Sequence, residues 1–386
     1  METSWITSAP ASTEATVVIG GGFGGMSAIQ TLRHRHPEIP VVLIEPRQRF
    51  IFQPLLYELL SGELQPWEVT PDLNQLTASL GVSWLRDSVV SIDTRQRSLT
   101  LASGRSLTWR QLLITAGSQP NDYGTPGVRE HSLSFRDDDD VQRLRQRIAT
   151  LKKRSLDSAL VIVGAGATGV ELACKLADLL DGAAALHLIE MGSSILPNST
   201  AFNREQASVA LERRNITVHL NTAVTAVEAE QVLLKPGTAI RHQGLIWTAG
   251  SQAVSIPILP APAHHRGRLN IEATLRMEGQ EAVFAIGDIS GCPDANWPAT
   301  AQVAMQQGAA VAEALAAQRR GSPLQPFAFM DRGEMLSLGV GDAALTGLGM
   351  TLAGPIAFQI RRATYLTRLP GASLGLRSAG AWLLGR

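Results

Sequence analysis

Two glycine-rich turns of the same kind lie 144 residues apart, counted from Gly20 to Gly164. The first spans residues 20–25 and follows the apolar run 16–19, and the second spans residues 164–169 and follows the run 160–163. A glycine turn between a strand and a helix lets the backbone approach a pyrophosphate, which the first N–H groups of the helix can bind. The repeat predicts an α/β chain with two doubly wound domains, each of which binds a dinucleotide.

An acidic residue closes the next apolar run after each turn. Glu45 lies 20 residues after Gly25, and Glu190 lies 21 residues after Gly169. A carboxylate at this place can accept hydrogen bonds from a ribose hydroxyl. One glycine turn alone is also typical of an ordinary tight turn, but two with the same strand, spacing and acid favour nucleotide binding.

We call each glycine turn with its acidic residue a nucleotide cradle, and two cradles require two nucleotides. Hydride transfer pairs a flavin that stays bound with a nicotinamide that binds and leaves. We therefore predict FAD at the first turn and NAD(P)H at the second. Two identical ligands are the alternative.

The composition limits the other classes of partner and site. A chain of 386 residues can form two or three domains, and its 34 basic and 34 acidic residues predict no nucleic acid partner. Cys174 and Cys292 form no C-x-x-C or metal-binding spacing, so we predict no metal site. The helix after Gly25 also lacks a cysteine pair, which predicts that electrons leave the flavin without passing through a protein disulfide.

Three further segments carry structural signals. Residues 1–14 have neither the basic nor the apolar region of a signal peptide. Residues 335–358 are largely apolar but contain five glycines and Pro355, which favours strands and turns over a membrane span. Residues 137–154 begin with four aspartates and end with three basic residues, which predicts a helix whose charges oppose its dipole.

The segments 112–117 and 245–250 both end in Thr-Ala-Gly. Paired strand ends with small residues are typical of crossings between two nucleotide domains, although tight packing explains either one alone. The predicted domains are residues 15–129 (FAD domain, first part), 130–250 (NAD(P)H domain, inserted), 251–325 (FAD domain, second part) and 326–386 (C-terminal strands and a basic amphipathic segment).

Together with Ala-Ile-Gly-Asp at 285–288 and Thr-Ala-Gln-Val-Ala-Met-Gln-Gln at 300–307, the two turns resemble those of type II NAD(P)H:quinone oxidoreductases. Residues 52–59 and 333–339 look more narrowly like the cyanobacterial and plastid branch associated with demethylphylloquinone reduction. The resemblance implies an enzyme that passes a hydride from NAD(P)H to FAD and two electrons to a membrane naphthoquinone, without pumping protons.

The resemblance also implies roles for single residues. Asp288 would accept hydrogen bonds from the ribityl chain, and Gln302 and Gln306, on one face of a helix, would contact the quinone. Glu171 would lie near the nicotinamide. The structural alternatives are an N-cap for Asp288, two solvated glutamines, and a first-turn glutamate that the helix dipole favours.

The expected contacts of FAD are Gly20, Gly22, Phe23, Gly24, Gly25, Glu45, Ala116, Gly117, Gly287, Asp288, Ala301 and Gln302. The expected contacts of NAD(P)H are Gly164, Gly166, Thr168, Gly169, Glu190 and Gly250.

Residues 343–386 contain five arginines and no acid, interspersed with aromatic and aliphatic residues. This pattern predicts a peripheral segment that lies on an anionic membrane. The resemblance implies the cytoplasmic or the thylakoid membrane, on the face toward the cytoplasm. The alternative is a basic tail packed on its own domain or on a second subunit of a homodimer. Rival functions are a sulfide:quinone oxidoreductase, a reductase of a small iron–sulfur protein and a flavin redox sensor.

Overall fold

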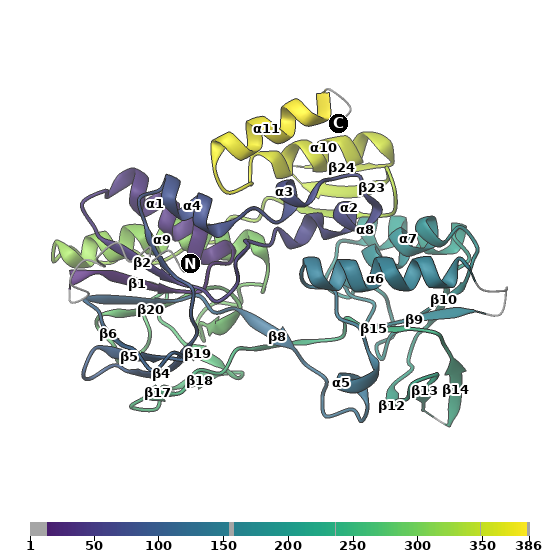
Figure 1. The fold of residues 1–386 in the computed structure, drawn as a ribbon, viewed down its shortest axis with the longest axis horizontal. Coiled ribbons are helices and arrows are strands. Elements are labelled where there is room, and N and C mark those ends of the chain that lie inside the picture. Colours follow the sequence, from purple (N-terminus) through teal and green to yellow (C-terminus); the bar gives the residue numbers. More distant parts are fainter. Residues whose placement is uncertain (1–13, 154–157, 236, 348, 384–386) are drawn as a thin grey trace, which may run out of the picture. The chain divides into compact units, whose positions relative to one another are not determined.

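The computed structural model describes residues 14–153, 158–235, 237–347 and 349–383 (Figure 1). The prediction that residues 1–14 form no signal peptide concerns residues outside the described part of the chain, except for Glu14. The chain divides into two compact units. Unit 1 contains the residues up to Phe50, Pro71–Gln119 and Gln252–Met330, and unit 2 contains Ile51–Thr70, Pro120–Ser251 and the residues from Asp331 onward.

Unit 1 is built on a five-stranded sheet in which every pairing is parallel. The strand order is β20 (Val283–Ala285), β7 (Gln111–Ile114), β1 (Thr16–Ile19), β2 (Val41–Ile44) and β3 (Ser83–Leu85). Strands β1, β2, β7 and β20 are buried along their whole length, as expected for apolar runs covered on both faces. The order reverses between β1 and β7, and ligands of such sheets bind where the strands end at that reversal.

Helices α1 (Phe23–Arg35) and α9 (Ala301–Arg319) pack against each other in this unit (Figure 1). The other elements of unit 1 are α4 (Leu73–Ser79), β4 (Val89–Asp93), β5 (Ser98–Leu101), β6 (Ser106–Thr108), β17 (Ile258–Leu259), β18 (His264–His265), β19 (Arg268–Asn270), η3 (Gly287–Ile289) and β21 (Ser290–Gly291).

Unit 2 repeats the parallel arrangement with four strands. The order is β11 (Thr217–His219), β10 (Ala185–Ile189), β9 (Ala159–Val163) and β15 (Leu245–Trp247). Its helices include α6 (Asp138–Leu151), α7 (Ala167–Leu180) and α8 (Ala201–Arg213). The second glycine turn therefore follows a buried central strand, as the first one does.

The remaining elements of unit 2 form two antiparallel sheets and several short helices. The sheets consist of β12 (Val224–Val227), β13 (Gln231–Leu234) and β14 (Thr238–Arg241), and of β22 (Glu334–Ser337), β23 (Ala343–Gly347) and β24 (Met350–Ala353). The helices are η2 (Gln53–Leu55), α2 (Leu56–Ser61), α3 (Pro66–Val69), α5 (Val128–His131), α10 (Pro355–Leu366) and α11 (Ala372–Leu383). Strands β8 (Ser118–Pro120) and β16 (Ser251–Ala253) lie where the chain passes from one unit to the other.

Two local predictions are confirmed. Helix α6 begins after Asp137, whose carboxylate accepts a hydrogen bond of 2.9 Å from the backbone N–H of Asp140. The apolar stretch 335–358 forms β22 to β24 and the start of α10. Within the described ranges, no helix combines the length and the apolar character needed to cross a membrane.

The predicted domain limits differ from the compact units at residues 51–70. The prediction placed this stretch in the first part of the FAD domain, but the structure groups it with unit 2 because α2 packs on α6 and α7. The C-terminal strands and helices also belong to unit 2, where α10 packs on β23 and α11 on α10 (Figure 1).

Candidate active site

Helices α1 and α7 begin at glycines and carry no side-chain cap. Their N-cap residues are Gly22 and Gly166, and a Cβ atom added to either would meet no atom within 4 Å. Four other helices, α4, α6, α8 and α9, are capped by the side chains of Asp72, Asp137, Thr200 and Thr300. Open backbone N–H groups at a helix N-terminus suit a phosphate, so both turns fit the pyrophosphates of FAD and NAD(P)H.

Glu45 lies at the end of β2 and is tied to the first turn. Its carboxylate accepts hydrogen bonds from the N–H groups of Gly21 (2.8 Å) and Arg47 (2.9 Å). The Arg47 side chain adds two more, from Nε at 2.8 Å and from a terminal nitrogen at 2.9 Å. Burial acts to raise the pKa of Glu45, but the bonds from Arg47 and Gly21 bring the pKa below its ordinary value.

Glu190 repeats this pattern at the end of β10. It accepts hydrogen bonds from the N–H groups of Ala165 (2.8 Å) and Gly192 (2.7 Å). Gly192 lies two residues after Glu190, at the position that Arg47 has after Glu45. No cationic side chain in the described ranges bonds to Glu190. The Glu190 carboxylate can therefore accept ribose hydroxyls without competition from a cation.

The two Thr-Ala-Gly strand ends also share their hydrogen bonds. The Thr115 hydroxyl donates to the Gly20 carbonyl (2.7 Å), and the Thr248 hydroxyl donates to the Gly164 carbonyl (3.0 Å). Each hydroxyl also donates to the carbonyl of the last residue of the preceding strand, which is Ile19 in β1 and Val163 in β9. Both glycines have left-handed backbones, with φ of 104° and 102°. These threonines were not among the predicted site residues, although the duplicated motif contained them.

The small residues after these threonines turn the chain at the crossings. Gly117 follows Ala116 with φ of 71°, and Gly250 has φ of 72°. A side chain at Gly250 would also collide with the ring of Tyr123. Tight local packing thus explains Gly250 by itself, and its contact with NAD(P)H stays a prediction.

Asp288 follows β20 in the short helix η3. Its Oδ2 accepts a hydrogen bond of 2.8 Å from the Ser118 hydroxyl, and the Gly287 N–H donates to Oε1 of Gln307 at 2.8 Å. The carboxylate keeps further acceptor positions, which suit the hydroxyls of a sugar or ribityl chain. Ser118 and Gln307 were missed by the sequence prediction because each lies far along the chain from its partner.

The predicted helix around residues 300–307 is α9, and Gln302 and Gln306 lie one turn apart on it. Gln306 does not present a free amide, however. Its Nε2 donates to the Met330 carbonyl (2.8 Å), and its Oε1 accepts from the Met330 N–H (3.1 Å). Both polar atoms therefore hold a backbone segment in place. Each of these atoms keeps one further hydrogen-bonding position, so Gln302 and Gln306 both stay predicted quinone contacts.

Glu171 is a buried residue of α7, with 7% of its surface exposed. Its Oε1 accepts a hydrogen bond of 2.7 Å from the Ser337 N–H, and the Arg361 guanidinium lies 3.8 Å away. Burial raises the pKa of Glu171 to about 7, even though Arg361 acts to lower it. Glu171 can therefore bind or release a proton near neutral pH.

Arg361 is 1% exposed, although it was counted among the surface charges of the basic tail. Its guanidinium forms an ion pair with Glu58 and donates to the Pro54 carbonyl at 2.6 Å. The correction has a physical cause: α10 packs on its own unit, and the charge is buried with a partner on α2. Two other arginines lie over aromatic rings, Arg362 over Trp382 and Arg377 over Trp67.

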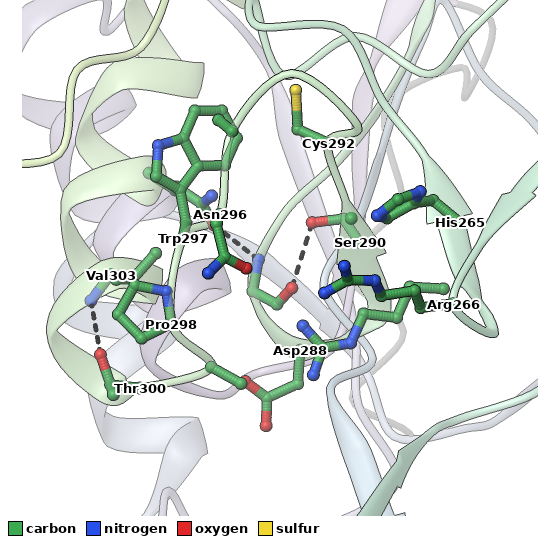
Figure 2. A pocket seen from close by; sticks show the side chains of 16 residues that line it. His265, Arg266, Asp288, Ser290, Cys292, Asn296, Trp297, Pro298, Thr300 and Val303 are labelled. Atoms are coloured by element: carbon green, nitrogen blue, oxygen red, sulfur yellow. Dashed lines mark hydrogen bonds between the residues drawn. The ribbon is translucent and has the colours of Figure 1, made fainter. Parts of the chain in front are cut away.

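A cavity of about 280 Å³ opens beside the start of α9 in unit 1 (Figure 2). Asp288 and Thr300 line it, together with side chains of the β18–β19 hairpin and of the loop that precedes α9. It is separate from the glycine turns, none of whose residues line it.

Both cysteines lie in the part of the chain that the structure describes. Cys174 and Cys292 are buried and unpaired, and burial raises the pKa of Cys174 to about 12, so its thiol stays protonated. No group of three or more potential metal ligands occurs among the residues that the structure describes.

Residues 14–308 match the family model of the pyridine nucleotide-disulphide oxidoreductases. The chain belongs to this family. It is 36% identical to demethylphylloquinone reductase NdbB of Synechocystis, over 95% of this chain and 96% of that protein. It is 30% identical to the alternative NAD(P)H-ubiquinone oxidoreductase C1 of Arabidopsis thaliana, over 92% and 77% of the two chains. Type II NADH:quinone oxidoreductase Ndh of Mycobacterium tuberculosis is 26% identical, over 97% and 89%.

The fold of the chain is also similar to that of a solved structure. The structure of NDH2 from Plasmodium falciparum in complex with NADH superposes with a TM-score of 0.84 at 18% identity, over 94% of this chain and 96% of that one. The α/β class with parallel sheets is confirmed, as are FAD and NAD(P)H as the cofactors of the family. The prediction of a type II NAD(P)H:quinone oxidoreductase is confirmed at the level of the family.

Proposed function

We propose that this chain passes a hydride from NADH to FAD and then two electrons to a prenylated naphthoquinone of the demethylphylloquinone type. The duplicated cradle carries the proposal, because two uncapped helix starts with matched acids supply separate sites for two nucleotides. The similarity to demethylphylloquinone reductase over nearly the whole chain supports the choice of quinone.

The chain contributes binding, orientation and proton exchange. FAD, when bound, supplies the chemistry that accepts a hydride and delivers electrons two at a time or singly. Residues 20–25 and Asp288 would hold it, and residues 164–169 with Glu190 would hold the nicotinamide dinucleotide. Quinol formation from NADH consumes one proton from solution, and Glu171, with a pKa of about 7, is suited to exchange a proton.

Steady-state kinetics with both nicotinamides test this function. The FAD-loaded protein is expected to oxidise NADH rapidly only when a prenylated naphthoquinone is added. NADPH should have a lower kcat/KM, by about tenfold, because the Glu190 carboxylate repels a 2′-phosphate. Gly192→Arg should narrow this difference by placing a guanidinium beside the acid. Turnover that no quinone stimulates would refute the function, and a higher kcat/KM with NADPH would refute only the preference.

Gln302→Leu separates the two half-reactions. Flavin reduction by NADH should keep its rate, while reoxidation by quinone should slow by about fivefold, since one charge-neutral hydrogen bond contributes about 1 kcal/mol. Stopped-flow absorbance measures both rates. Gln306→Leu is the companion variant one turn away: it removes the two bonds to Met330, whose backbone water can reach, and should lower stability by no more than about 1 kcal/mol. Equal reoxidation rates in Gln302→Leu and the parent protein would place the quinone elsewhere.

Helices α10 and α11 are proposed to rest on an anionic membrane at its cytoplasmic face. Large apolar side chains on them are exposed, with Ile356 67% and Leu376 75% accessible. Ile360 is exposed as well and lies one turn after Ile356, on the same face of α10. Exposed apolar residues with Arg362 on α10 and Arg377 on α11 suit an interfacial position. A second copy of the chain is the alternative occupant of this face.

Ile356→Ser with Leu376→Ser is expected to reduce co-sedimentation with vesicles of anionic lipid by about tenfold, because each loses buried apolar area in the interface. Val209→Ser, at an exposed position of α8, is the control and should bind as the parent does. Deletion of residues 355–386 is unsuitable, because it removes Arg361 from its buried ion pair. Unchanged vesicle binding together with a loss of dimers in light scattering would assign this face to dimerisation.

A further inference from the structure

The cavity beside α9 lies on a different side of that helix from α1. Thr300, Val303 and Gln307 line it, and their spacing places them on one face of α9. Gly308 faces α1 instead, where a Cβ atom would collide with the backbone of Gly24. The first glycine turn therefore lies outside this cavity, whereas Gly287 and Asp288 belong both to the cavity wall and to the expected flavin contacts.

The lining of the cavity is rich in hydrogen-bond donors. Arg266 and Arg268 come from the β18–β19 hairpin, and Asn296 and Trp297 come from the loop before α9. Figure 2 shows Arg266 entering from the side of His265 and Trp297 standing on the opposite side. Neither arginine forms an ion pair or a side-chain hydrogen bond with any other residue that the structure describes.

The charges of the cavity do not cancel. Asp288 is the one carboxylate in the lining, against two guanidinium groups, and its Oδ2 already accepts the bond from Ser118. A guanidinium presents a planar fork of N–H donors that matches the two oxygens of a carboxylate or phosphate. A volume of about 280 Å³ admits a small molecule. It lies just below the range usual for drug-sized ligands, about 300–1,000 Å³.

We propose that this cavity is a binding site for a small oxyanion, a carboxylate or phosphate group held between Arg266 and Arg268. The site goes beyond the proposed oxidoreductase activity. Because Asp288 belongs both to the cavity wall and to the expected flavin contacts, an anion bound here would change the electrostatic environment of the flavin.

Isothermal titration of the FAD-loaded protein tests the site without depending on quinone reduction. The probes are benzoate, inorganic phosphate and benzamide, a neutral analogue of benzoate. Benzoate and phosphate are expected to bind with Kd in about the millimolar range or below, and benzamide is expected not to bind. Benzoate should also perturb the visible absorption of FAD. Vesicles of phosphatidylglycerol form a further arm, because a lipid headgroup carries the same phosphate chemistry.

Matched variants assign the binding to these residues. Arg266→Gln with Arg268→Gln should weaken anion binding at least about tenfold, since each lost charge-assisted bond contributes roughly a factor of ten. Arg95→Gln with Arg320→Gln changes the net charge equally at exposed positions of the same unit and should have no effect. If the first pair fails to retain FAD, Arg266→Gln alone replaces it.

The proposal is overturned if no free anion or anionic vesicle binds saturably, if benzamide binds as tightly as benzoate, or if the arginine variants bind as the parent protein does. Binding of vesicles alone, lost in the Arg266 and Arg268 variants, would support the site and identify a headgroup as its ligand.

Discussion

Gly22→Val is expected to give a folded protein that retains little FAD. Space is open beside Gly22 in the structure, and no neighbour forces glycine there. A branched side chain would instead occupy the space that the pyrophosphate needs, and overpacking costs about 1–3 kcal/mol, or roughly tenfold to 100-fold in affinity. The ratio of flavin absorbance to protein measures the loss.

Gly166→Val is the matched control, because Gly166 has the same place and the same open space in the second turn. This variant should keep its flavin but lose NADH binding, so that NADH no longer reduces the flavin at low concentration. Full flavin retention in Gly22→Val, or flavin loss in Gly166→Val, would reverse or refute the assignment of the two cradles.

Arg361→Met is expected to lower the free energy of unfolding by about 3–5 kcal/mol, because it leaves the buried carboxylate of Glu58 without a partner. The double variant Glu58→Gln with Arg361→Met should recover much of this loss, since neither charge then stays buried. Arg95→Met, at an exposed position, should change the stability little. Denaturant unfolding gives all three values. A double variant no more stable than Arg361→Met would show that the arginine acts through packing and not through charge.

The loss in Arg361→Met should grow as the pH rises. The pKa of Glu171 is raised from 4.5 to about 7, so its neutral form stabilises the fold, and this contribution is lost as the pH rises from about 4.5 through about 7. Without Arg361, burial and the Glu58 carboxylate oppose the ionised form of Glu171, and only the bonds from Ser337 and Tyr57 still favour it. The variant should therefore be closest to the parent protein near pH 5 and furthest from it near pH 8.

Local sequence patterns were sufficient for the nucleotide cradles. Each glycine turn is flanked by its strand and helix within a few residues, so its conformation depends on neighbours in the chain. The acids at Glu45 and Glu190 were found from spacing alone, and the structure shows both of them bonded to their glycine turns. The cap at Asp137 and the strands within residues 335–358 followed from equally local signals.

The partners of Gln306 and Arg361 were decided by tertiary structure alone. Gln306 bonds to a backbone 24 residues away, and Arg361 pairs with a side chain 303 residues away. The sequence predicts a helix surface at Gln306 and a basic tail at Arg361, because composition does not show which face of a helix another element will cover. The same holds for the cavity of Arg266 and Arg268, whose walls come from a hairpin, a loop and a helix that only folding brings together. The sequence by itself determined where nucleotides can bind, since that depends on short-range backbone geometry. Packing between distant segments decided which polar side chains are left free to act, since burial and hydrogen-bond partners are properties of the folded chain.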